Sequence, residues 1–302
     1  MDVIDRSGYP LTSGIKFSRE GKTLVLKLDS QSLVSNMQSD QSAFEGWALC
    51  VYANNKGEYE HLRIDWTPLD KEKLPTQELG HYYRFLFRAY MFQENYPSIV
   101  EIRPTAESVL DVDEMKRWVL NFPSRETKES EKKNENAEAH LERELLAMMD
   151  GHFDYCDHQL PVGLFVDEIH NVNARSSGKL SQIDLWSVKD GALNIYELKN
   201  DVNEAVGIIS ELLFYTNVMD CFRRHIFNYP ATFPRKRVYY RHSKELYDDI
   251  VNDRIEVVNG YLLANNIHPR ISDDVINLMN SNTAGIVFSK LPVNDFKSAL
   301  KK

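Results

Sequence analysis

Two apolar, partly alternating runs in the second half of the chain predict a β-hairpin. Residues 182–188 and 193–199 each have the length and composition of a short strand, and Asp190-Gly191 lies in the connection between them. Asp-Gly between two such runs is a strong hairpin signal, because both turn residues must tolerate a positive φ. With Asp190 and Gly191 as the two loop residues, apolar side chains pair across the strands: Val188 with Leu193, Trp186 with Ile195, Leu185 with Tyr196, and Ile183 with Leu198.

The remaining periodic stretches predict strands and helices on both sides of a polar segment. Before it, the pattern predicts strands at 22–28, 47–53, 59–66 and 99–102, and helices at 81–93 and 111–120. After it, helices are predicted at 137–149, 204–224 and 272–279, and strands at 163–169, 260–264 and 285–289. Residues 124–138 are almost wholly polar, as in a linker. The sequence therefore predicts an N-terminal α+β domain (1–122), a charged linker (123–136) and a C-terminal α/β domain (137–302).

Charge and composition narrow the function classes. The chain has 302 residues and a formal net charge of -9, so it lacks the overall basic charge that indicates nucleic-acid binding, and a local basic patch would be needed. Its three cysteines are too few for a disulfide framework or a zinc finger. The first residues lack the pattern of a secretory signal, and no apolar run approaches the roughly 20 residues of a membrane span. We expect a cytoplasmic protein that does not enter a membrane.

The hairpin register also brings two carboxylates together. It places Asp184 directly opposite Glu197, and Lys199, two residues further on, points to the same face. Like charges opposite one another destabilise a sheet, and a divalent cation would remove the repulsion by taking both carboxylates as ligands. Lys199 would add a positive charge beside a phosphate or the attacking water. This constellation indicates metal-assisted phosphodiester hydrolysis.

Asp184, followed by Glu197-Leu198-Lys199 on the next strand, resembles the motif of the PD-(D/E)xK nuclease superfamily, whose members have restriction-endonuclease-like folds. Ile183 stands where the namesake motif has Pro, and many members lack that Pro. The resemblance implies an αβββαβ core with a mixed sheet flanked by helices over residues 137–302. It also implies Mg²⁺ or Mn²⁺ held by Asp184, Glu197 and the backbone carbonyl of Leu198, with Lys199 positioning the attacking water or stabilising the pentavalent phosphorus.

The helix predicted over 137–149 supplies a further acidic candidate. Glu142 lies beside Leu145 and Met149, at the edge of the apolar stripe. In the resembled family the first core helix often contributes a Glu that reaches the metal site, so the resemblance carries this role to Glu142, with Glu138 as second choice. The alternative is a solvated carboxylate on a charged helix.

Two residues of the helix predicted over 204–224 stay outside the predicted site. Glu211 and Tyr215 lie one turn apart. Some branches of the resembled family place Gln and Tyr at this spacing near the site. Because Glu stands at the Gln position here, neither residue is assigned a role.

One basic stretch stands out in this acidic chain, and tyrosines interleave it. Lysine and arginine there would neutralise phosphates, and tyrosine could stack on bases or bond to the nucleic-acid backbone. The alternative is a solvated loop followed by an edge strand whose arginines discourage pairing. The predicted nucleic-acid-binding residues are Arg223, Arg224, Arg235, Lys236, Arg237 and Arg241.

Two other patterns have competing interpretations. The aromatic residues between Tyr82 and Phe92 could form a platform for bases, although a helix packed against a sheet is the simpler interpretation. Residues 152–158 contain two His, two Asp and one Cys, but no second ligand pair follows at zinc-site spacing. We interpret that stretch as the loop before the strand at 163–169.

The function hypothesis from the sequence is a Mg²⁺-dependent nuclease with DNA as the expected substrate. Two alternatives stay open. The chain could be a catalytically silent nuclease-fold protein that binds nucleic acid or protein, with the N-terminal domain as a recognition module or as the surface for a homodimer or protein partner. In the other, Asp184, Glu197 and Lys199 form a structural ion network without a metal.

Overall fold

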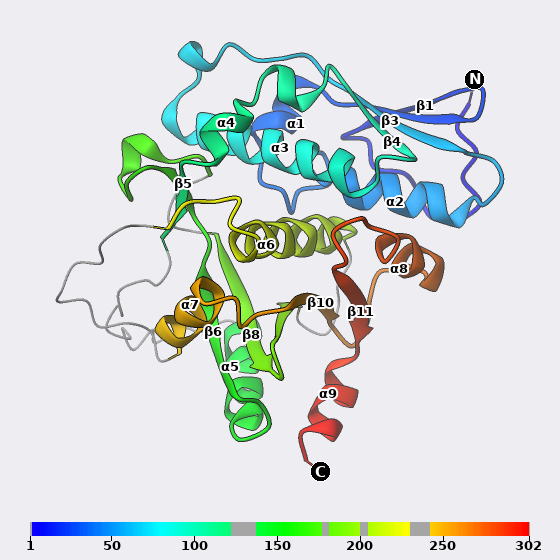
Figure 1. Ribbon diagram of the computed structural model, residues 1–302. Helices are drawn as coiled ribbons and strands as arrows, with labels where there is room; N and C mark the ends of the chain where they lie inside the picture. Colours follow the sequence, from blue (N-terminus) through cyan, green and yellow to red (C-terminus); the bar gives the residue numbers. More distant parts are fainter. Residues whose placement is uncertain (1, 122–136, 177–180, 200–204, 230–241, 302) are drawn as a thin grey trace.

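The protein is a mixed α/β structure in which the helix α6 (Gly207–Arg223) lies between two sheets (Figure 1). The computed structural model describes residues 2–121, 137–176, 181–199, 205–229 and 242–301. The predicted linker at 123–136 lies outside these ranges, as do Arg235, Lys236, Arg237 and Arg241. None of the helices within them is long and apolar enough to cross a membrane.

The N-terminal half builds a four-stranded sheet covered by two long helices. Its strand order is β1-β2-β3-β4, with β1 and β2 antiparallel and the other neighbours parallel. The helices α2 and α3 pack between this sheet and α6 (Figure 1). The elements are β1 (Lys16–Glu20), β2 (Thr23–Lys27), α1 (Ser30–Val34), α2 (Phe44–Asn54), β3 (His61–Asp65), α3 (Thr76–Asn95), β4 (Val100–Arg103), α4 (Val112–Met115) and β5 (Trp118–Leu120).

Two predictions in this half are wrong and one alternative is excluded. The run 47–53 belongs to the helix α2, because an apolar run does not by itself distinguish a buried strand from a buried helix. The predicted helix 111–120 is a single turn, α4, whose first turn is capped by the Asp111 carboxylate, and β5 follows it. The aromatic stripe of α3 is core rather than a platform for bases: Tyr82, Phe85, Phe87 and Phe92 are buried.

The C-terminal half builds a five-stranded mixed sheet with helices on both faces, which confirms the predicted class. Its strand order is β11-β10-β9-β8-β6, antiparallel from β6 to β9 and parallel from β9 to β11. The helix α6 covers one face, and α5 packs on the other. The elements are α5 (Ala137–Met149), β6 (Tyr155–Pro161), β7 (Leu164–Val166), β8 (Gln182–Lys189), β9 (Ala192–Leu198), α7 (Ser243–Val251), β10 (Val257–Leu263), α8 (Asp273–Met279), β11 (Val287–Leu291) and α9 (Val293–Ala299).

The β8–β9 hairpin has the predicted register. Leu185 pairs with Tyr196, and the ladder continues from there to the turn. The predicted pairs Asp184–Glu197 and Ile183–Leu198 lie beyond the last pair of this ladder and are not part of it. The turn residues Asp190 and Gly191 have φ values of 50° and 74°. These are the left-handed conformations that an Asp-Gly turn of this kind requires.

The first strand of the sheet differs from the prediction. The strand expected at 163–169 is the short β7, which pairs with β5 of the N-terminal half rather than with β8. The position beside β8 is taken by β6, within the stretch interpreted as a loop. Because β6 is an edge strand that carries Asp, His and Gln, its sequence lacks the apolar pattern of an interior strand.

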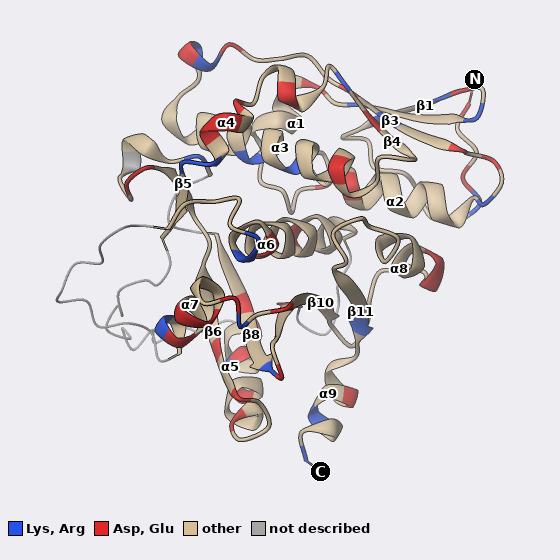
Figure 2. Ribbon diagram, viewed as in Figure 1, with Lys and Arg blue, Asp and Glu red and all other residues tan. Residues whose placement is uncertain are grey.

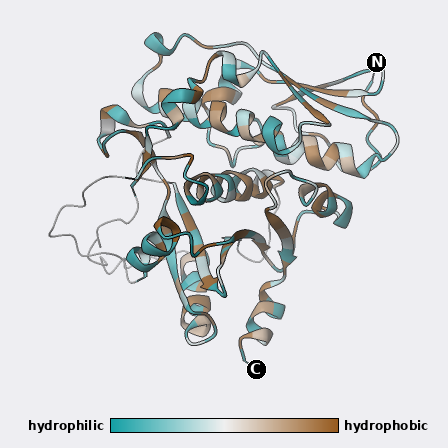
Figure 3. Cartoon of the chain, viewed as in Figure 1, coloured by the Kyte–Doolittle hydropathy of each residue, from teal (hydrophilic) through white to brown (hydrophobic). Residues whose placement is uncertain are grey.

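The two halves share an apolar core around α6. Every residue from Gly207 to Phe222 is buried, and one apolar cluster contains residues of α2, α3, α6 and both sheets. Figure 3 shows hydrophobic residues in brown along α6 and the elements facing it. Glycines permit the closest approaches. A Cβ atom added to Gly207 would lie 2.6 Å from the carbonyl oxygen of Gln38, and one added to Gly46 would lie 2.5 Å from that of Val206.

The variant Gly207→Ala is expected to destabilise the protein by about 1–3 kcal/mol, because the new methyl group would overlap the Gln38 backbone rather than a movable side chain. At a helical position without this contact, replacing Gly by Ala stabilises by about 0.5–1 kcal/mol. The sign of the change in melting temperature therefore reports the contact. A melting temperature equal to or above that of the wild type would contradict the close approach.

Candidate active site

The predicted acid pair and lysine converge at the end of β8 and β9. Lys199 Nζ lies 2.6 Å from Glu197 Oε1. The carboxylate of Asp184 turns toward the same end of β9, where its Oδ2 accepts a hydrogen bond of 2.9 Å from the Leu198 N–H. The three side chains project from the face of the sheet that α6 covers, since they alternate with Leu185 and Leu198, which pack on the opposite face.

A third carboxylate, which the sequence analysis left out, completes the cluster. Glu211 near the start of α6 places its Oε2 3.1 Å from Lys199 Nζ. Its other oxygen accepts a hydrogen bond from the Gln38 side chain, which belongs to the N-terminal half. The spacing of Glu211 and Tyr215 was the available sequence signal. No local pattern could have identified Gln38, because the contact joins residues 173 positions apart.

Burial and mutual repulsion shift the ionisation of these acids. Glu197 is 2% exposed. Burial raises the pKa of Asp184 to about 7, against the opposing effects of Lys199 and the Leu198 N–H, and Glu211 and Glu142 raise it further. Burial, followed by the charges of Asp184 and Glu211, holds the pKa of Glu197 well above its usual range.

Lys199 keeps its proton. Burial alone would lower the pKa of its ammonium group, but the neighbouring carboxylates of Glu197, Glu211 and Asp184 outweigh burial and raise that pKa. With three carboxylates and one ammonium group, the fully ionised cluster would carry a charge of two negative units. A cluster with this imbalance attracts either protons or a cation.

The oxygen donors fit a hard divalent cation. Glu197 Oε2 is buried and has no hydrogen-bond partner among the described residues. Magnesium is commonly bound through one or two carboxylates and retains several waters, which is compatible with the predicted ligands Asp184 and Glu197. No group of three or more His, Cys, Asp or Glu with metal-binding geometry occurs in the described part of the chain, including residues 152–158. The metal roles of Asp184, Glu197 and the Leu198 carbonyl stay predictions.

Glu142 is buried, so the interpretation as a solvated carboxylate is wrong. It is 6% exposed, and its Oε1 lies 2.5 Å from His158 Nδ1 and 3.2 Å from Gln159 Nε2. Its helix, α5, covers the face of the sheet opposite α6. Glu142 therefore contacts the edge strand β6, and its charge acts on Asp184.

The predicted basic residues that are described lie away from the acids. Asp220, itself buried, pairs with Arg223 at 2.6 Å and with Arg224 at 3.5 Å. Figure 2 shows this basic group in blue at the C-terminal end of α6. Twelve residues separate Glu211 from Arg223, and the helical rise places them about 18 Å apart along the axis. The structure thus does not bring Arg223 and Arg224 together with Asp184 and Glu197.

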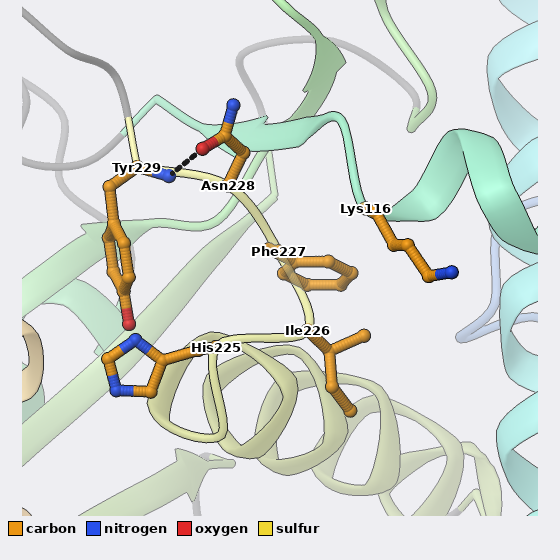
Figure 4. A pocket seen from close by; sticks show the side chains of 6 residues that line it. All are labelled: Lys116, His225, Ile226, Phe227, Asn228 and Tyr229. Carbon is orange, nitrogen blue, oxygen red and sulfur yellow. Dashed lines mark hydrogen bonds between the residues drawn. The ribbon is translucent and has the colours of Figure 1, made fainter.

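A hollow at that same end of α6 is separate from the acid cluster. It has a volume of about 530 Å³ and is lined by Lys116, His225, Ile226, Phe227, Asn228 and Tyr229 (Figure 4). His225 is engaged by Asp253 at 2.7 Å. None of the described residues that line the hollow is acidic, and the hollow lies at the C-terminal end of α6, away from Asp184 and Glu197.

Comparison with family models, with curated proteins and with solved structures finds no match to this chain. The functional conclusion therefore depends on the cluster of Asp184, Glu197, Lys199 and Glu211. The sequence predicted the first three members, and the fold added the fourth.

Proposed function

We propose that this chain is a divalent-metal-dependent nuclease of the PD-(D/E)xK type, with DNA as its substrate. The single observation that carries the proposal is the pair of carboxylates, Asp184 and Glu197, at one end of the β8–β9 hairpin with Lys199 ion-paired beside them. The element order also supports it: along the chain α5, β6, β8, β9, α6 and β10 occur in the αβββαβ order of the resembled core, with β7, which pairs with β5 outside this sheet, inserted after β6 and the helix α7 inserted before β10.

Each residue has a distinct proposed role. Asp184 and Glu197 would hold Mg²⁺ or Mn²⁺. When bound, the cation supplies a Lewis acid that polarises the phosphoryl group and the attacking water. Lys199, whose pKa the neighbouring carboxylates raise, would stabilise negative charge on the phosphoryl oxygens or position the attacking water. Glu142 is a positioning residue that fixes β6 through His158 and adds negative charge near Asp184.

Titration with Mn²⁺ tests the metal site. Binding requires ionised carboxylates and releases their protons. Because the pKa of Asp184 is about 7, its ionised fraction rises about tenfold between pH 6 and pH 8. We expect saturable heat in calorimetry, with an affinity at least about tenfold higher at pH 8. Buffers with different ionisation enthalpies should report proton release.

The same titration separates this proposal from the alternatives. A catalytically silent binding protein or a metal-free ion network would give no saturable heat at either pH. Cleavage of plasmid and of single-stranded DNA with Mn²⁺, and its loss with excess chelator, completes the test. Calorimetry without a binding isotherm, together with no cleavage, would reject the nuclease proposal.

A further inference from the structure

A cleft between the two halves opens beside the acid cluster. It has a volume of about 530 Å³ and lies between the α1–α2 connection, α3 and the first turns of α6. In Figure 1 the α1–α2 connection, in blue, descends from the N-terminal half toward α6. Glu211 and Tyr215 form the α6 side of the cleft, and Gln38, Gln77 and His81 contribute to the opposite side.

Glu211 links the cleft to the proposed catalytic lysine. Glu211, part of its wall, lies 3.1 Å from Lys199 Nζ, and the Lys199 side chain is 21% exposed. Gln38, also in the wall, donates a hydrogen bond to Glu211. A group bound in the cleft would therefore contact Glu211, which is itself ion-paired with Lys199.

The N-terminal wall is built from hydrogen-bond donors. Arg84 is buried, and its NH2 donates to His81 Nδ1 at 2.6 Å. Burial and Arg84 lower the pKa of His81 to about 4, so its imidazole is neutral. A neutral imidazole that accepts a hydrogen bond at Nδ1 carries its proton on Nε2 and can donate it. The amide of Gln77 adds donors from the same helix. Guanidinium, imidazole and amide N–H groups are the groups that contact phosphate and sugar oxygens in nucleic-acid complexes.

The size of the cleft limits what can enter it. Volumes of about 300–1,000 Å³ enclose a small ligand, which corresponds to one or two nucleotides of a strand. A duplex has a major groove about 12 Å wide, and a paired strand cannot enter a hollow of this size without leaving its partner.

We propose that the cleft receives an unpaired strand, so that the substrate class is single-stranded DNA or the unpaired arm of a duplex, positioned by Gln77 and His81. This inference rests on the proposed nuclease function.

Three forms of one labelled oligonucleotide test the proposal with Mn²⁺ and the full-length protein: a single strand, a blunt duplex, and a duplex with an unpaired arm. We expect cleavage of the single strand and of the arm at least about tenfold faster than of the blunt duplex. The double variant Gln77→Ala, His81→Ala should raise KM for the single strand by about tenfold with little change in kcat. Gln31→Ala, an exposed glutamine of α1 outside the cleft lining, should match the wild type.

The outcomes separate the inference from the proposed function. Equal cleavage of the blunt duplex and the single strand would overturn the inference and leave the nuclease proposal standing. An unchanged KM in the folded double variant would also overturn the assignment of Gln77 and His81. No cleavage of any form by the wild type would reject the nuclease function itself.

Discussion

The variant Lys199→Met is expected to cleave DNA at least about 100-fold more slowly than the wild type at saturating Mg²⁺, since removing one preorganised charge that stabilises a transition state costs about two to three orders of magnitude in kcat. Methionine keeps most of the side-chain volume and removes the ammonium group that lies 2.6 Å from Glu197. The effect should fall on kcat rather than on KM, because the charge acts on the phosphoryl group as negative charge develops.

The same hairpin offers a matched control for this variant. Lys189 lies at the turn end of β8, is exposed, and bonds to the backbone carbonyl of His152. Lys189→Met should therefore cleave DNA as the wild type does. Melting temperatures of both variants check that each is folded. Equal cleavage by Lys199→Met and the wild type would remove Lys199 from the mechanism.

The double variant Asp184→Asn, Glu197→Gln is expected to lose metal binding and cleavage and yet to melt at a higher temperature than the wild type at pH 8. Both substitutions preserve shape and remove charge, so Glu211 and Lys199 remain as a balanced pair. The Asn oxygen can still accept the hydrogen bond from the Leu198 N–H. Relief of about 1–3 kcal/mol of repulsion corresponds to a few degrees in melting temperature for a chain of this size.

The pH dependence gives this prediction a second readout. Asp184 and Glu197 have folded-state pKa values above their unfolded values, so the folded state binds more protons than the unfolded state in the window where they differ, which for Asp184 runs from roughly pH 4 to pH 7. These two groups therefore make the metal-free wild type less stable as pH rises through that window. The double variant should lack this decline. A variant that melts below the wild type at both pH 5 and pH 8 would instead support the structural ion network.

The features that the sequence predicted well are those set by neighbouring residues. The hairpin register follows from turn chemistry at Asp190-Gly191 and from the alternation of the flanking strands, so Asp184, Glu197 and Lys199 could be placed without the rest of the fold. The helices α3, α5 and α8 were also predicted, because each combines helical periodicity with a recognisable length or cap.

The features that the sequence did not predict depend on distant contacts. The run containing Trp47 is apolar on every side because α2 is packed between the first sheet and α6, and that burial hides its periodicity. The strand β6 is polar because it forms an edge. Glu211 enters the site because α6 crosses the sheet at the hairpin's open end, and Gln38 reaches Glu211 because Gly207 lets the two backbones approach.

The helix α6 is enclosed on all sides, and this burial limits which rearrangements of the gene would still give a folded protein. The residues of α6 from Gly207 to Phe222 have no face toward water, so a shortened protein that begins at the fifth helix would present a bare apolar ridge to the solvent. If recombination moved the hairpin of Asp184, Glu197 and Lys199 together with α6 into another protein, that protein would have to supply apolar residues that bury α6 in place of the N-terminal half. The N-terminal half is thus expected to be inherited together with the C-terminal half.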